Sequence, residues 1–139
     1  MVNTFLPSPD FRYCARVLDD KRLYKQIVEC KQMLLAIEAN NNGTKYGYQH
    51  HPIVKMWQRY SEALRLYQFT MLKEWTMRRY SFDIDANNIN YYPKLPQWLG
   101  DEELHKSHRL NLLYKDYDHY SKYFSEEKPT TKPEYKWVV

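Results

Sequence analysis

Residues 19–39, which read DDKRLYKQIVECKQMLLAIEA, carry the strongest structural signal in the chain. The apolar side chains of this stretch recur every three or four residues, a spacing that puts them on one face of an α-helix. They are Leu23, Ile27, Cys30, Leu34 and Ile37. Asp19 and Asp20 suit the first turn of this helix, and the asparagines before Gly43 tolerate the positive φ at which a helix ends. The pattern therefore predicts a long helix with one apolar face.

Two later segments show the same spacing. Pro52 suits the first position of a helix, and apolar residues continue at helical intervals to about residue 79. Asp101 is a typical helix cap, because its carboxylate can accept the first free N–H groups. We expect the helix that it begins to run to about Tyr114.

The segments outside these three helices are predicted to form the connections between helices and the two ends of the chain. Residues 3–13 hold two prolines and read as an irregular arm, with a helix beginning near Asp10, and residues 81–100 break the helical pattern. A short helix is expected near residues 116–124, before an extended end. Since no segment alternates with period two, we predict an all-α fold. It is a single compact domain (residues 1–139) of three main helices, with an irregular N-terminal arm and an extended aromatic–basic C-terminal tail.

Composition narrows the class of protein. The chain has 139 residues, of which 43% are hydrophobic and 17% aromatic, as in one folded domain. No apolar run approaches 18 residues, and Met1 is not followed by the basic and apolar stretches of an export signal. Cys14 and Cys30 are therefore expected to be free thiols in an intracellular protein. The net charge of +4 fits a nucleic-acid partner without requiring one.

Glu29 is the first candidate for chemistry. Several polar side chains share its side of the helix, opposite the apolar face. They are Arg22, Lys25, Gln26 and Gln32. A carboxylate among cations and amides can act as a catalytic acid or as an electrostatic stabiliser. The same pattern also fits a solvated face with ion pairs four residues apart, such as Lys25 with Glu29.

The amino terminus is the second candidate. Val2 is small, so removal of Met1 would leave a Val2 α-amine; if Met1 is retained, the candidate amine is that of Met1. An α-amine has a pKa of about 7.7–8.0 and is partly unprotonated near neutral pH, whereas an ordinary lysine at about 10.4 is not. An unprotonated amine can attack an electrophilic carbon and form a Schiff base. Lys25 is the alternative nucleophile. We expect a terminal arm to tolerate added residues unless it is buried.

Histidines and aromatic residues near the C-terminus are further candidates. His105 and His108 stand three residues apart, with Arg109 next. Two histidines at this spacing can bind a metal ion, but the chain has no His-Glu-x-x-His motif, so we predict surface or phosphate-contacting histidines and no metal site. Lys122 and Tyr123 belong to a run in which lysines alternate with aromatics that can stack on unpaired bases. The alternative is a tail packed over the helical core.

Short motifs in a fixed order make the chain similar to a known family. They are Asn3-Thr4-Phe5-Leu6-Pro7, then Leu18-Asp19-Asp20-Lys21-Arg22-Leu23 with Lys25-Gln26 and Glu29, then His51-Pro52 with Met56-Trp57, then Trp98-Leu99-Gly100-Asp101 before His105-Lys106-Ser107-His108-Arg109. The sequence resembles the pyrimidine dimer DNA glycosylases, the endonuclease V type first known from phages, and especially a branch of small bacterial and viral proteins. The resemblance spans nearly the whole chain.

The resemblance implies excision of a damaged base, followed by strand cleavage at the abasic sugar. The family's nucleophile is the processed α-amine, which corresponds to Val2, and its essential glutamate corresponds to Glu29. The family has a histidine where this chain has Arg22, and arginines where it has Val28 and Gln32. These departures affect groups that hold the sugar-phosphate and the lesion, while the amine and the carboxylate are both present.

The sequence therefore predicts a DNA repair glycosylase with AP lyase activity, acting on damaged double-stranded DNA such as DNA with ultraviolet pyrimidine dimers. We expect a monomer that needs no metal or organic cofactor. The expected DNA contacts are Lys21, Arg22, Lys25, Gln26, Lys31, Gln32, His108, Arg109, Lys122 and Tyr123. Two other functions fit the sequence: a non-catalytic DNA- or RNA-binding module on the same scaffold, and a helical protein–protein adaptor.

Overall fold

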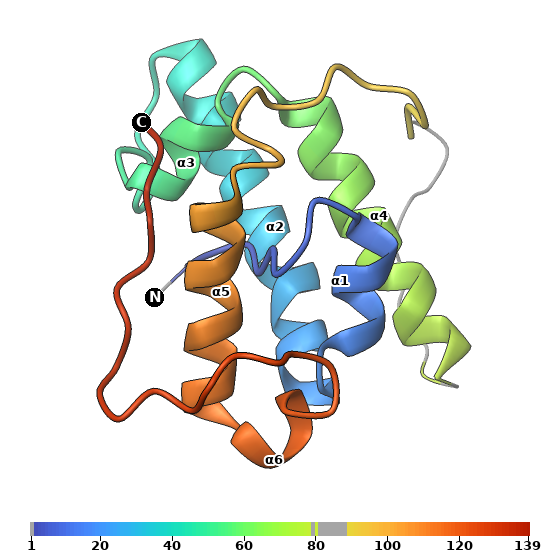
Figure 1. The fold of residues 1–139 in the computed structure, drawn as a ribbon. Coiled ribbons are helices and arrows are strands. Elements are labelled where there is room, and N and C mark those ends of the chain that lie inside the picture. Colours follow the sequence, from blue (N-terminus) through green and yellow to red (C-terminus); the bar gives the residue numbers. More distant parts are fainter. Residues whose placement is uncertain (1, 79, 81–88) are drawn as a thin grey trace.

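The computed structural model describes residues 2–78, 80 and 89–139 (Figure 1). These residues form six helices and no β-strand. The helices are α1 (Phe11–Val17), α2 (Asp20–Asn42), α3 (Pro52–Trp57), α4 (Ser61–Met77), α5 (Glu102–Lys115) and α6 (Tyr117–Tyr120). The all-α class is therefore confirmed. The short helices expected near Asp10 and after residue 116 are α1 and α6.

The long helix predicted over residues 19–39 is α2. It extends to Asn42, and Gly43 then takes a left-handed conformation with φ of 70° and donates its N–H to the Ala39 carbonyl. The helix thus includes asparagines that we had expected in its stop signal. The extra residues are held because Asn40 Nδ2 donates to the side chain of Gln58 at 2.8 Å, which fastens this end of α2 to the segment after α3.

The prediction of one continuous helix from residue 52 to about residue 79 is wrong. The chain forms α3, turns, and then forms α4. The Tyr60 N–H donates to the Trp57 carbonyl at 2.7 Å and closes the turn. Within the turn, Gln58 Nε2 donates to the Ile37 carbonyl of α2 at 3.3 Å. The turn changes the direction of the chain, so that α3 packs near the end of α2 and α4 packs along it.

The described part of the connection between α4 and α5 has the structure that we predicted from the sequence. Residues 89–100 contain no helix, as the prolines and the glycine led us to expect. Residue 79, at the predicted end of the second helix, and residues 81–88 lie outside the described residues.

The C-terminal tail is extended, as predicted, and it packs on α5 (Figure 1). The Tyr135 ring meets His108 edge-on with 5.2 Å between the ring centres. Lys136 Nζ pairs with Asp101 at 2.8 Å. The tail therefore covers the helical core here, which was the alternative to a free nucleic-acid arm.

The N-terminal arm has no regular secondary structure, as predicted, but it lies inside the molecule. It passes between α2 and α5 (Figure 1), and residues 2–6 are all buried. Cys14 and Cys30 are free thiols, as expected, and both are buried in the same core. The arm is thus a structural element around which the helices pack.

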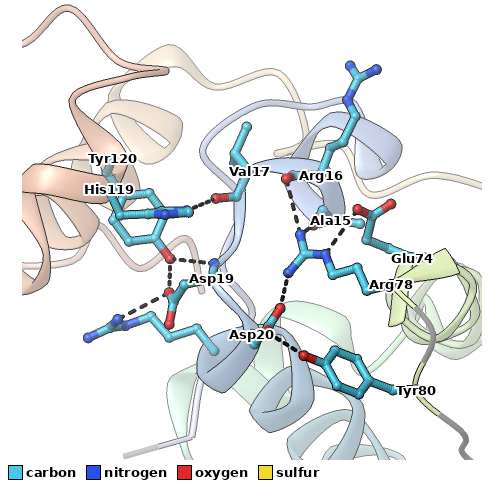
Figure 2. Close-up of polar contacts among 11 residues, drawn as sticks. Ala15, Arg16, Val17, Asp19, Asp20, Glu74, Arg78, Tyr80, His119 and Tyr120 are labelled. Atoms are coloured by element: carbon cyan, nitrogen blue, oxygen red, sulfur yellow. Dashed lines mark hydrogen bonds and ion pairs between the residues drawn. The ribbon is translucent and has the colours of Figure 1, made fainter. Parts of the chain in front are cut away.

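Arg78, the C-terminal cap of α4, holds the junction between α1 and α2 (Figure 2). Its guanidinium donates to the Ala15 and Arg16 carbonyl oxygens at 3.2 Å each, and to Asp20 at 2.9 Å. The same group pairs with Glu74 at 3.2 Å. The last carbonyl groups of a helix lack partners within that helix. Arg78 supplies partners for two of them and fixes the first turn of α2 at the same time.

Residues of α6 hold the other side of this junction (Figure 2). His119 Nε2 donates to the Val17 carbonyl at 2.8 Å, and the Tyr120 hydroxyl donates to the Asp19 carboxylate. Asp19 also pairs with Arg22 at 3.1 Å. Although burial raises the pKa of Asp19, the hydrogen bonds from Tyr120 and Arg22 outweigh burial and lower it below its usual value. The junction therefore holds an ionised carboxylate that orients Arg22.

We expect Arg78→Met to destabilise the fold by about 1–3 kcal/mol, because the carbonyl groups of α1 and the Asp20 carboxylate lose a charged donor. Denaturant unfolding, compared with Arg65→Met at an exposed position of the same helix, measures this difference. The control variant should change the free energy of unfolding by less than about 0.5 kcal/mol. Equal effects of the two variants would show that Arg78 does not hold the junction.

Candidate functional site

The amino-terminal arm is bonded to side chains instead of to a neighbouring strand. Gln26, fully buried on α2, donates from Nε2 to the Asn3 carbonyl at 3.1 Å and accepts the Phe5 N–H at 2.8 Å. One turn later, Glu29 Oε2 accepts the Asn3 N–H at 2.8 Å. Buried peptide groups need such partners, and these two side chains bond the arm as the backbone of an adjacent strand would.

Two histidines of α5 bond the next part of the arm. The Leu6 N–H donates to His108 Nδ1 at 2.9 Å, and His105 Nδ1 donates to the Leu6 carbonyl at 2.7 Å. His105 Nε2 accepts the Gly100 N–H at 2.9 Å. Burial lowers the pKa of His108 to about 3 and also lowers the pKa of His105. Both rings are therefore neutral at neutral pH, as His108 must be for its Nδ1 to accept a hydrogen bond from the Leu6 N–H.

Helices α3 and α4 complete the hold on the arm. The Tyr67 hydroxyl lies 2.7 Å from the Phe5 carbonyl oxygen and 2.6 Å from Gln26 Oε1. Trp57 Nε1 donates to Thr4 Oγ1 at 3.1 Å. Four helices thus bond an arm that the sequence marked only as irregular. We expected the arm to tolerate added residues unless it is buried. Since it is buried, that expectation does not apply.

This arrangement places Val2 next to Glu29. The Val2 side chain is buried, and the adjoining Asn3 nitrogen is the one that donates to Glu29 at 2.8 Å. Three covalent bonds join the Asn3 and Val2 nitrogens, and this path spans at most about 3.7 Å. The Val2 nitrogen therefore lies within about 6.5 Å of the Glu29 carboxylate.

A pocket of about 230 Å³ opens beside Glu29. Its walls come from the arm, from α2, from the end of α5 and from the C-terminal tail. The lining residues are Asn3, Phe5, Lys21, Arg22, Lys25, Glu29, Lys115, Lys132 and Tyr135. Five of them are Lys or Arg, and Glu29 is the acidic one. The pocket therefore attracts anions, and a phosphodiester is an anion that such donors bind well.

The pKa values of two pocket groups are shifted. Burial raises the pKa of Glu29 above its ordinary value of 4.5, against the opposing effects of the Asn3 N–H and of Lys25, whose Nζ lies 3.9 Å away. Burial also lowers the pKa of Lys115, and the positive charges of three neighbouring pocket residues lower it further. Such shifts gather at functional sites. A carboxyl group with a raised pKa can exchange a proton with a reacting molecule more readily near neutral pH.

The structure brings together part of the predicted site. Lys21, Arg22, Lys25 and Glu29 line one pocket, and Val2 is adjacent. The pocket thus contains Arg22, Lys25 and Glu29 of the polar face that the helical spacing had indicated, whereas Gln26 and Gln32 of that face do not line it.

Gln26 and His108, which we predicted to contact DNA, are buried inside the fold. Their side chains have 0% and 2% of their surface exposed, and both are bonded to the arm. A buried side chain cannot reach a phosphate at the surface, so we revise the prediction that these two residues contact DNA. They hold the arm instead.

Arg109 is also occupied within the fold. Its guanidinium donates to the Pro7 carbonyl at 2.9 Å and pairs with Glu102 and with Glu126. The other predicted DNA contacts lie outside the pocket lining. They are Lys31 and Gln32 on α2, and Lys122 and Tyr123 after α6. For these residues, contact with DNA stays a prediction.

Sequence reasoning assigned no place in this pocket to five of its residues. Asn3 and Phe5 stand in the first motif of the arm, which was the available signal for them. Lys115, Lys132 and Tyr135 come from the end of α5 and from the tail. No spacing along the chain relates these three residues to Glu29.

The two histidines of α5 serve the fold. His105 uses both ring nitrogens, and His108 uses Nδ1, for the arm and the loop before α5. In the part of the chain that the structure describes, no group of three or more His, Cys, Asp or Glu side chains could hold a metal ion. No helix of that part is long and apolar enough to span a bilayer.

One comparison with known proteins gives a match. A family model described as pyrimidine dimer DNA glycosylase matches residues 2–88. This range includes the arm and α1 to α4, and therefore Val2 and Glu29, whereas α5 and the tail lie beyond it. No curated protein and no solved structure matches the chain.

We expect Gln26→Leu to destabilise the fold by at least about 2 kcal/mol, because the Asn3 carbonyl and the Phe5 N–H would be buried without partners. Urea unfolding provides the measurement. The matched control is Gln32→Leu on the same helix, which should change the stability by less than about 0.5 kcal/mol. Similar stabilities of the two variants would mean that Gln26 is not needed to hold the arm.

Glu29→Gln should leave the fold equally or more stable at pH 7. Because burial raises the pKa of Glu29, the folded state binds the carboxyl proton more tightly than the unfolded state, and ionisation costs stability. Glutamine removes this cost and still accepts the Asn3 N–H. The advantage should shrink as the pH falls through the raised pKa toward the ordinary value of 4.5, and it should be lost below 4.5, where Glu29 is protonated in both states. Denaturant unfolding at pH 7 and pH 4 tests this. Marked destabilisation at pH 7 would show that the charge itself holds the arm.

Proposed function

The chain belongs to the pyrimidine dimer DNA glycosylase family, and we propose that it excises a damaged pyrimidine and then cleaves the strand through an imine on its own amino terminus. One observation carries this proposal. The buried Glu29 carboxylate accepts the Asn3 N–H at 2.8 Å, beside Val2 and at the wall of a positively charged pocket. An amine, a carboxylate and a phosphate-binding surface are the groups that this reaction needs.

The first step is displacement of the base. After removal of Met1, the unprotonated Val2 amine attacks C1′ of the damaged nucleotide. A bond forms between this nitrogen and C1′, and the glycosidic bond breaks with its electron pair going to the base. One amine proton balances the negative charge on the departing base. The C1′–O4′ bond then breaks with its electron pair going to O4′, O4′ takes up the second amine proton, and an imine is left at C1′.

The second step is cleavage of the strand. The imine makes the 2′ hydrogen acidic, so a base can remove this proton, and the electron pair then expels the 3′ oxygen with its phosphate. Water finally hydrolyses the imine and frees the Val2 amine. Glu29 is suited to the proton transfers and to stabilising positive charge at C1′, since its carboxylate is buried beside the amine.

The α2 cations of the pocket hold the DNA in this proposal. Lys21, Arg22 and Lys25 would neutralise phosphates of the damaged strand, and each such contact steepens the salt dependence of binding. Exposure of C1′ requires distortion of the duplex, which costs least at a damaged pair. The substrate is accordingly damaged double-stranded DNA.

Covalent trapping tests the mechanism. Borohydride reduces an imine to a stable amine, so incubation with abasic-site duplex and borohydride should link protein to DNA. Peptide mass mapping should place the added mass on the Val2 α-amine. Attachment at Lys25 or Lys115 would refute the amino-terminal mechanism. Binding without trapping would favour the non-catalytic DNA-binding module.

Glu29→Gln is the matching variant for catalysis. Base excision should fall by roughly 10²-fold or more, with little change in DNA affinity, because the carboxylate acts on the charge that develops during reaction. Thermal unfolding confirms that the variant is folded. Near-normal turnover would remove Glu29 from the mechanism.

A variant with two residues added before Val2 is a second test of whether the Val2 α-amine is the nucleophile. The amine would move by about 3.3–3.6 Å per added residue, which is large against the reacting distance of about 3–3.5 Å. Trapping should therefore collapse. Because the arm is buried, this variant also needs a thermal unfolding control.

A further inference from the structure

The pocket beside Glu29 contains two lysines from outside α2. Lys115 is the last residue of α5, and Lys132 lies in the extended tail. Both lie beyond the residues matched by the family model. The fold thus adds two positive charges to a surface that already contains Lys21, Arg22 and Lys25.

This concentration of cations is unfavourable without an anion. Two of the α2 cations, Lys21 and Arg22, stand in the first turn of the helix, where the helix dipole is already positive. Burial lowers the pKa of Lys115, and Arg22, Lys132 and Lys25 lower it further through repulsion. Asp19 compensates Arg22, and Glu29 is the carboxylate in the pocket itself. More positive than negative charge therefore remains to be neutralised.

Asn3 provides an independent sign of a ligand. Its side chain is 3% exposed, lines the pocket, and uses its oxygen to accept the Thr4 N–H at 2.8 Å. A side-chain interaction with Asn3 opposes the effect of burial on the pKa of Tyr135, but the Asn3 Nδ2 group meets no acceptor with full hydrogen-bond geometry among the described residues. A buried N–H group without an acceptor is costly. An oxygen of a bound anion would satisfy it.

We propose that Lys115 and Lys132 bind a backbone phosphodiester of the damaged strand, next to the nucleotide that reacts at Val2. The inference rests on the proposed function, and it assigns the end of α5 and the tail to the DNA-binding surface. Cations and a free amide donor predominate in the pocket, and such groups recognise phosphate oxygens. The tail is thereby both a cover of the core and a part of the substrate site.

The chain offers a matched control for each lysine. Lys106 is an exposed residue of α5, and Lys128 is an exposed residue of the tail, and neither lines the pocket. The test compares Lys115→Gln and Lys132→Gln with Lys106→Gln and Lys128→Gln. The probe is a fluorescent duplex with a tetrahydrofuran abasic analogue, which binds without being cleaved. Its affinity is measured at several salt concentrations.

Each pocket variant should reduce the slope of log affinity against log salt by about 0.9, and the double variant should reduce it by about twice as much. Lys115→Arg and Lys132→Arg should restore the slope, because they keep the charge. The control variants should keep the wild-type slope. Thermal unfolding should show the pocket variants to be at least as stable as the wild type, since repulsion is relieved.

Two results would overturn the inference. Slopes of the pocket variants equal to those of the controls would show that these lysines do not contact phosphate. Failure of the arginine variants to restore the slope would show that their charge is not what matters. Borohydride trapping of the wild-type protein tests the proposed function independently, so failure of the phosphate site can be told apart from failure of the catalytic mechanism. Reduced slopes without trapping would keep the phosphate site and refute the catalytic mechanism.

Discussion

An arm without secondary structure can cross a protein core only if its peptide groups find partners among side chains. In this fold the partners are arranged as pairs three residues apart on two helices: Gln26 and Glu29 on α2, and His105 and His108 on α5. Each pair bonds consecutive peptide groups of the arm. The relative position of α2 and α5 therefore depends on the arm between them, because the polar groups of each would otherwise be buried unpaired.

Glu29 takes part in both the fold and the candidate site. Its carboxylate holds the backbone beside Val2, and burial makes its ionised form less favourable than in water. Stability alone would be served equally well by a neutral acceptor. A buried carboxyl group next to a chain terminus and a cationic pocket is thus better explained by chemistry than by folding.

The amino-acid sequence determined the helical class and most helix positions, because apolar spacing and capping residues are local properties. Gly43 ends α2, and Asp101 caps α5 through bonds to Glu103 and Leu104, as residues of these types do in many proteins. The turn between α3 and α4 escaped prediction because the apolar spacing continues through it. The turn is bonded to α2 through Gln58, a contact between residues distant in the chain.

For the candidate site, the sequence indicated Val2 and Glu29 through motif resemblance, and the α2 cations through helical spacing. It did not distinguish Gln26 from its exposed neighbours, since a polar residue at the edge of an apolar face can point either way. Only the tertiary structure, by placing the arm against that edge, made Gln26 a buried partner of the backbone. The same holds for Lys115 and Lys132. Their charge is evident in the sequence, but the pocket that they share with Glu29 exists only because the folded chain brings three distant segments together.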